Sequence, residues 1–224
     1  MKNTNLFQRI PFRLRLILLI TVPLLLLSLA AYRLLPPPSV QVDYINVGSS
    51  ALVGDSILLT SSEGKVVLID GGYPGTGALD RIRARGITHI DLIVLSHPHD
   101  DHAGGLIDVL NAIPVDRMVA NGQTLDDSEI YKELQKAIKS SGVRYQIVKA
   151  GDSLPFGRLS FNVLAPPKVI KEIGHNNNSV VLRLDVGKVS FLFAGDAQRM
   201  EEQWMMDAGV PLKSTILKVG HHGA

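Results

Sequence analysis

A short apolar run, followed at once by histidines and acids, is the feature that most constrains this chain. Residues 90–95 are almost continuously apolar, which is typical of a strand buried on both faces of a sheet. The chain then reads Ser96-His97-Pro98-His99-Asp100-Asp101-His102. Functional sites gather at the carboxyl ends of such strands. The pattern therefore predicts an active site at a sheet edge rather than a polar surface loop.

The residue types in this cluster predict a metal centre. Because the chain has no cysteine, a metal must be held by nitrogen and oxygen ligands, which suit zinc, manganese or iron. His97 and His99 are two residues apart and can point to one ion. Asp101 and His102 can serve a second ion about 3.5–4 Å away. We expect two divalent ions, zinc or manganese.

Three more candidate ligands follow predicted strands. Asp196 comes just after the strand predicted over 189–193, either as a carboxylate that bridges two ions or as the N-cap of a helix over 198–208. His221 and His222 follow the last predicted strand. One of this pair is expected to bind metal, and the other to contact substrate or a ligand.

Three residues have two interpretations each. Asp70 ends the strand predicted over 65–70, and it either holds the histidine loop by a hydrogen bond or forms a turn. His175 is either a further ligand or a loop residue. Asn178, in the asparagine run that follows, can ligate weakly or bind substrate.

The N-terminus predicts export. Residues 16–32 are uncharged and almost wholly apolar, and residues 1–33 contain five basic side chains and no acid. This pattern is typical of a signal peptide or a short signal anchor; a buried core helix is the alternative. We divide the chain into this segment over 1–35, a proline linker over 36–39 and one domain over 40–224.

Charge adds one restriction. The net charge of +2 arises in the leader, because the residues after Arg33 contain 18 basic and 21 acidic side chains. The body is mildly acidic, so global charge gives no support for loose nucleic-acid binding. The net charge does not exclude a local basic patch.

Hydrophobic periodicity predicts two layers of sheet with helices outside. The chain also stops at Ala224, directly after a strand, so we expect the C-terminal half of the fold to be incomplete. The expected strands cover 40–44, 56–60, 65–70, 90–95, 117–120, 159–164, 180–186, 189–193 and 215–219, and the expected helices cover 76–85, 104–113, 128–141 and 198–208.

Taken in order, these motifs resemble the metallo-β-lactamase superfamily over residues 40–224. Within that superfamily, the chain is similar to the extracytoplasmic hydrolase domain of the DNA-uptake channel protein ComEC and its free-standing relatives. The first likeness rests on His97-x-His99-x-Asp101-His102, Gly195-Asp196 and His221-His222-Gly223. The second rests on residues 43–48, 54–58, 68–72, 177–184 and 217–223.

The resemblance implies an α/β (α+β) fold, an αββα sandwich with two metals at one edge. His97 and His99 would hold the first ion, with Asp196 between the two. His222, or else His221, would complete the second site beside Asp101. Where the superfamily often has a lone histidine ligand, this chain offers His175 and residues 176–178, which puts the first site's full ligand set in doubt.

The implied activity is hydrolysis by metal-activated water, with Asp101 also orienting the nucleophile. The expected substrate is a phosphodiester, and the ComEC-like resemblance implies extracellular DNA, as in competence. Alternatives are another ester, a lactone, a phosphorylcholine ester or a β-lactam, and a non-catalytic membrane module. We expect an extracytoplasmic protein, secreted or anchored through residues 16–32, and predict no protein partner.

Overall fold

The computed structural model describes residues 11–48 and 54–224, in two compact units, 1–37 and 38–224. The first unit contains α1 (Phe12–Leu34), which includes Pro23. Among the described helices, α1 is long and apolar enough to cross a membrane, and it contains the predicted apolar run. The basic residues Lys2 and Arg9 of the predicted leader lie outside the described residues.

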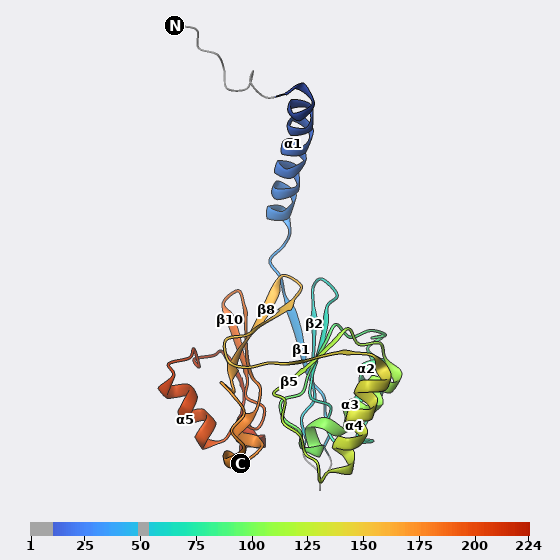
Figure 1. Cartoon of the computed structure of the whole chain (residues 1–224), viewed down its shortest axis with the longest axis vertical. Helices are drawn as coiled ribbons and strands as arrows, with labels where there is room; N and C mark the ends of the chain where they lie inside the picture. Colours follow the sequence, from blue (N-terminus) through green and yellow to red (C-terminus); the bar gives the residue numbers. More distant parts are fainter. Residues whose placement is uncertain (1–10, 49–53) are drawn as a thin grey trace. The chain divides into compact units, whose positions relative to one another are not determined.

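The second unit is built on two sheets with helices on their outer faces (Figure 1). The first sheet has its strands in chain order; β1 to β3 run antiparallel, and β3 to β6 run parallel. Helices connect the parallel strands, as parallel pairing requires. The elements are β1 (Val40–Tyr44), β2 (Ile57–Ser61), β3 (Val66–Ile69), α2 (Ala78–Ala84), β4 (Leu92–Val94), α3 (Asp100–Ala112), β5 (Arg117–Ala120), α4 (Glu129–Ser141) and β6 (Arg144–Ile147).

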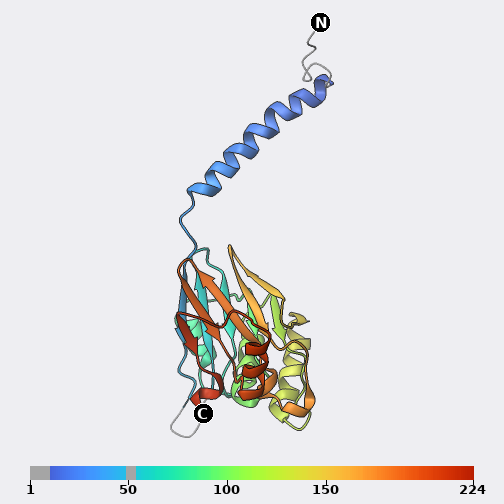
Figure 2. The same ribbon diagram turned by 90° about the vertical axis from the view of Figure 1, so that its left-hand side faces the viewer.

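The second sheet has the order β11-β10-β9-β8-β7; it lies beside the first in Figure 1, and Figure 2 turns it toward the viewer. Its pairs are antiparallel except β10 with β11. Its elements are β7 (Ser153–Phe156), β8 (Leu159–Ala165), η2 (Lys171–Ile173), η3 (Asn176–Asn178), β9 (Val181–Val186), β10 (Val189–Phe193), α5 (Arg199–Asp207), β11 (Ile216–Lys218) and η4 (Gly220–Gly223).

Three apolar layers hold the second unit together. Along β2 and β3, alternate side chains point to opposite faces, so Leu58 and Leu68 pack against the helices while Leu59 and Val67 face the other sheet. The central layer contains the buried rings of Phe156, Phe161 and Phe193, and a smaller layer lies under α5. The order of layers is αββα, which confirms the predicted fold class.

The start of α3 differs from the prediction. A helix was expected over 104–113, but it begins at Asp100, so Asp101 and His102 lie in its first turn. The amides of His102 and Ala103 both donate to the carbonyl oxygen of His99. Two acids near a helix N-terminus are favourable to the helix dipole. The prediction that the helix begins at Gly104 was therefore wrong. Glycine is a poor helix former, but the favourable acidic first turn outweighs the low helix propensity of the glycines that follow it.

Two strands were missed. β6 is an exposed edge strand of four residues, in which Tyr145 and Ile147 alternate with Arg144 and Gln146, and a run this short gives a weak pattern. β7 alternates between exposed and buried residues, but Pro155 interrupts it, and proline is tolerated only because β7 is also an edge.

A close backbone contact fixes α3 against the loop that follows β3. The amide of Gly71 donates to His102 O, and that of Gly105 donates to Gly72 O, both at 2.8 Å. A Cβ on Gly105 would fall on the carbonyl oxygen of Gly71. Glycine here is therefore a requirement of packing, and the contact sets the height of His102 above the sheet.

We predict that Gly105→Ala destabilises the protein by about 1–3 kcal/mol, because the new methyl group has no space. Helix propensity alone predicts the opposite, a gain of about 1 kcal/mol. Urea denaturation measures the change in the free energy of unfolding. Asp108→Ala, at an exposed position of the same helix, is the control and should stay within about 0.5 kcal/mol of the parent. A Gly105→Ala protein as stable as the parent contradicts the packing argument.

Candidate metal centre

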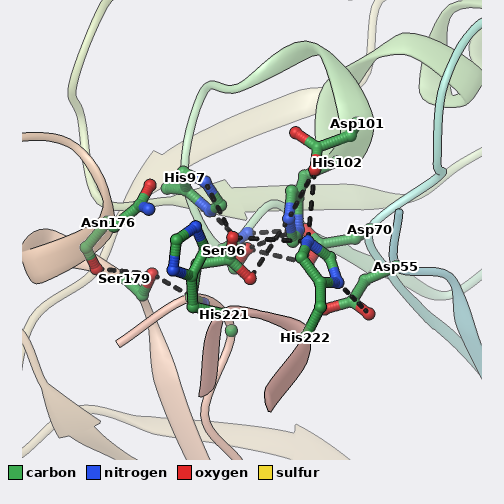
Figure 3. A network of polar contacts seen from close by, with 12 residues as sticks. Asp55, Asp70, Ser96, His97, Asp101, His102, Asn176, Ser179, His221 and His222 are labelled. Carbon is green, nitrogen blue, oxygen red and sulfur yellow. Dashed lines mark hydrogen bonds and ion pairs between the residues drawn. The ribbon is translucent and has the colours of Figure 1, made fainter. Parts of the chain in front are cut away.

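Side chains from both sheets meet at one edge of the sandwich (Figure 3). Four residues offer ligand atoms that all lie within 4.8 Å of one another: Asp101, His102, Asp196 and His222. The Nε2 atom of His102 lies 3.6 Å from Asp101 Oδ2 and 3.3 Å from Asp196 Oδ1. His222 Nε2 lies 3.2 Å from Asp101 Oδ2 and 3.5 Å from Asp196 Oδ2.

A second group of histidines adjoins this cluster. The ring centroids of His97 and His99 are 4.5 Å apart, and His97 Nε2 lies 3.8 Å from Asp196 Oδ2. His175 is beside His99, with ring centroids 5.4 Å apart. The two carboxylate oxygens of Asp196 thus face several histidines: Oδ1 lies near His102, and Oδ2 lies near both His222 and His97.

Asp70 orients His102. Its side chain is buried at the end of β3 and accepts hydrogen bonds from Ser96 N at 2.8 Å and Ser96 Oγ at 2.7 Å. Asp70 Oδ2 also lies 2.9 Å from His102 Nδ1, which leaves His102 Nε2 facing the cluster. The backbone of Asp70 has a φ of 58°, a conformation that non-glycine residues adopt at a cost. The turn at Asp70 is therefore explained by the contact between its side chain and His102, and not by a local backbone preference.

Asp55 and Lys218 are site residues that sequence reasoning missed. Lys218 Nζ forms an ion pair with Asp55 Oδ2, donates to Gly195 O at 2.8 Å and lies 3.7 Å from Asp196 Oδ1. Asp55 Oδ1 also lies 3.5 Å from His222 Nδ1. Asp55 therefore lies beside the Nδ1 atom of His222, at a longer distance than the 2.9 Å hydrogen bond between Asp70 and His102. The signal was the phrase over residues 54–58, which repeats the carboxylate-after-glycine pattern of Gly195-Asp196.

Two candidates have other contacts. His221 Nδ1 is 2.9 Å from Gln198 Nε2, and His221 is outside the four-residue group that contains His222. The Asn178 side chain bonds backbone atoms of Ile170 and Gly174, so it shapes the loop before β9. His89 is exposed and pairs with Asp116.

The cluster has the properties of a cation site. His97 Nε2, His102 Nε2 and Asp196 Oδ1 are buried and have no hydrogen-bond partner among the described residues. Leaving a buried polar atom without a partner costs free energy. Because these atoms converge on one space, divalent ions bound there would satisfy them. The nitrogen and oxygen donor set is the one that zinc or manganese binds.

Electrostatics agree with this interpretation. Burial disfavours the charged form of His102, but Asp70 and Asp196 outweigh it and raise the pKa of His102 to about 10. Burial likewise opposes ionisation of Asp196, yet His102, His222 and Lys218 lower its pKa to about 2. Burial, followed by the repulsion of neighbouring cations, holds the pKa of His97 well below its ordinary value. His97 is therefore neutral, as a metal ligand must be.

The sequence matches the metallo-beta-lactamase superfamily over residues 50–224. This chain belongs to that superfamily. It is 30% identical over 203 residues to ComE operon protein 3 of Bacillus subtilis, covering 82% of this chain and 25% of that protein. It is also 30% identical over 209 residues to Recombination protein 2 of Haemophilus influenzae, covering 90% and 24%. The chain is thus a superfamily hydrolase related to ComEC-like proteins, as the motifs predicted. It spans about a quarter of these relatives' length.

Two further similarities add to this picture. Endoribonuclease ysh1 of Schizosaccharomyces pombe is 26% identical over 191 residues, covering 79% of this chain and 25% of that protein. The crystal structure of MEM-A1, a subclass B3 metallo-beta-lactamase from a soil metagenome library, matches with a TM-score of 0.54 at 16% identity. The match covers 84% of this chain and 80% of the MEM-A1 chain. The structural match confirms the fold.

Glu201 is a buried acid beside the centre. It lies in α5 with 3% exposure; its Oε2 accepts from Ser179 N at 3.0 Å, and its Oε1 has no hydrogen-bond partner in the described chain. Ser179 Oγ in turn accepts from Asp196 N at 3.1 Å. Burial raises the pKa of Glu201 to about 9, although the Ser179 bond opposes the shift. At neutral pH the carboxyl is therefore protonated.

We predict that Glu201→Gln makes the protein more stable than the parent at pH 8, with a smaller difference at pH 5. A carboxyl whose folded pKa is raised favours folding below its unfolded pKa and loses that contribution as pH rises towards about 9. The gap should widen by up to about 1.4 kcal/mol per pH unit. Thermal and urea unfolding from pH 5 to 8.5 measure it.

Glu202→Gln, an exposed neighbour in the same helix, is the control for this experiment and should show no such trend. A gap between Glu201→Gln and the parent that is constant with pH would mean that Glu201 is ionised in the folded protein.

Proposed function

We propose that this chain hydrolyses phosphodiesters with two divalent ions, zinc or manganese. The observation that carries the proposal is the set of buried, unpaired ligand atoms from both sheets at one edge. In this proposal His97 and His99 hold the first ion, with His175 as the nearby further ligand, because its buried Nδ1 has no partner among the described residues.

The second ion belongs to the four-residue group. Asp101, His102 and His222 supply its ligands, and His222 is preferred to His221 because only His222 is in the group. Asp196 would be shared between the two ions, because its Oδ1 lies near His102 and its Oδ2 lies 3.5 Å from His222 and 3.8 Å from His97.

Bound divalent ions lower the pKa of water and neutralise charge that develops on phosphoryl oxygens. The protein does the positioning. Asp101 is less buried than Asp196, sits at the N-terminal turn of α3 and lies 3.2 Å from His222 Nε2. It is the carboxylate placed to orient an attacking water. Asp70 and Asp55 keep the Nε2 atoms of His102 and His222 directed at the centre.

The relatives support the substrate class. An endoribonuclease cleaves phosphodiesters, and recombination, the process for which Recombination protein 2 is named, is a reaction of DNA. We therefore propose DNA as the substrate. α1 supports an extracytoplasmic location, with residues 1–35 as a signal peptide or membrane anchor, 36–39 as a linker and 40–224 as the hydrolase domain.

The metal proposal predicts about two ions per chain by elemental analysis of the purified protein. His97→Ala/His99→Ala should lose a clear share of that metal, and His222→Ala should also lose metal while His221→Ala keeps it. Asp108→Ala is the control, because Asp108 is exposed in α3 and belongs to none of the candidate metal-ligand groups among the described residues. No metal in a folded parent, judged by circular dichroism, contradicts the proposal.

The substrate proposal predicts metal-dependent cleavage of single- or double-stranded DNA that a chelator abolishes. Asp101→Asn should lower kcat by about 100-fold or more, because the group that orients the water is lost. Metal content of the variant, measured in parallel, separates this effect from ligand loss. Activity confined to β-lactams, lactones or small esters such as a phosphorylcholine ester would refute the DNA substrate, and inactivity on every substrate would favour a non-catalytic module.

A further inference from the structure

α4 and β6 together form the most basic part of the domain. The two elements span 129–147 and contain four basic side chains and two acids, Glu129 and Glu133, whereas the other residues after Arg33 contain 14 basic and 19 acidic side chains. Glu129 pairs with Lys132, so the unbalanced positive charge of this part of the acidic body lies on Lys136, Lys139 and Arg144. Such a local patch is the usual electrostatic footprint of a polyanion partner.

The same two elements enclose a hollow of about 280 Å³. Its lining includes two aromatic rings, two amides and one ammonium: Tyr131, Tyr145, Gln123, Gln135 and Lys139. No acid is among the described residues that line it. Tyr145 is 38% exposed and Ile147 is 61% exposed, on the same face of β6. Exposed aromatic and aliphatic groups on an edge strand call for a ligand that covers them.

This combination fits a nucleobase. Bases stack on tyrosine rings and offer donors and acceptors that amide side chains bind, while lysines contact the phosphates. Burial raises the pKa of Tyr145 to about 12, with Tyr131 adding to the effect, so the phenol stays neutral beside a phosphate. The Gln123 amide is buried and its Oε1 accepts from Asn121 at 2.7 Å, so the amide open to a ligand is that of the half-buried Gln135; this amide is unsuited to an acyl chain, which favours a base over a lipid.

The hollow adjoins the metal centre through one loop, residues 121–128. At one end of this loop, the Asn121 amide donates to Asn178 O in η3. At the other end, Ser128 Oγ donates to Asp100 Oδ1 at 2.6 Å, one residue before Asp101. Gln123, in the middle, accepts from the Tyr131 hydroxyl through its carbonyl oxygen and lines the hollow. The loop therefore has the centre on one side and the hollow on the other.

We propose that the α4–β6 hollow is a base-binding subsite for single-stranded nucleic acid, in which Tyr145 stacks on an unpaired base and Lys139 contacts the adjoining phosphate. This inference rests on the proposed function, since the subsite would hold the strand whose phosphodiester reaches the metals. Duplex DNA is a poorer ligand, because its bases are already stacked and do not reach Tyr145.

The test is binding rather than cleavage. The full chain in detergent micelles, in metal-free buffer with chelator, is titrated against a fluorescent thymidylate strand of about 15 nucleotides, and anisotropy gives Kd. Tyr145→Ala should raise Kd about 5- to 100-fold, and Tyr145→Phe, which keeps the ring, should bind as the parent does. Lys139→Ala should reduce the salt slope of log Kd by about 0.7, and Lys188→Ala, in the exposed β9–β10 turn, should leave it unchanged.

The outcomes separate the two proposals, because binding without metal does not depend on hydrolysis. Parent-like strand binding by folded Tyr145→Ala overturns the subsite, even if the parent cleaves DNA. Duplex binding equal to strand binding also overturns it, as does Tyr145-dependent binding to phosphatidylglycerol vesicles without strand binding, which would assign the patch to a membrane. Tyr145-dependent strand binding by a protein that cleaves no phosphodiester supports the subsite and contradicts the proposed function.

Discussion

The carboxylate of Asp70 is the interaction on which the rest of the site depends. Its oxygens accept from Ser96 N and Ser96 Oγ and lie beside His102 Nδ1, so one buried side chain joins the ends of β3 and β4 to the start of α3. A histidine held at Nδ1 can direct only Nε2 at a cation. The left-handed backbone at Asp70 is the strain that this arrangement tolerates.

Charge balance explains the second half of the centre. Four carboxylates, from Asp55, Asp70, Asp101 and Asp196, gather in a largely buried space, and Lys218 is the ammonium among them. A buried acid without compensating charge is costly. Lys218 therefore reduces the negative potential of the four carboxylates without bonding to the histidine Nε2 atoms. It also links the loop before β2 to the turn after β10.

The sequence carried the fold class and the main cluster, because both leave periodic or local signals. The run over 90–95 and the histidines behind it predicted a strand and a site at its end; the structure has the strand, and His102 after it belongs to a group of candidate metal ligands. The contact between Asp55 and Lys218 left no such signal. Asp55 and Lys218 are 163 positions apart in the chain, and only the packing of two sheets brings them together. The choice between His221 and His222 likewise depends on which way the turn after β11 directs each ring.

The central apolar layer has a consequence beyond stability. Half of the centre comes from the first sheet and half from the second, so the gap between the two halves is the thickness of the layer that contains Phe156, Phe161 and Phe193. Face-to-face sheets sit about 10 Å apart, and that spacing follows from side-chain volume. The rings between the sheets are thus a spacer for the chemistry at the edge. A change of volume there alters ligand geometry without touching a polar atom, and core and site are under one and the same constraint.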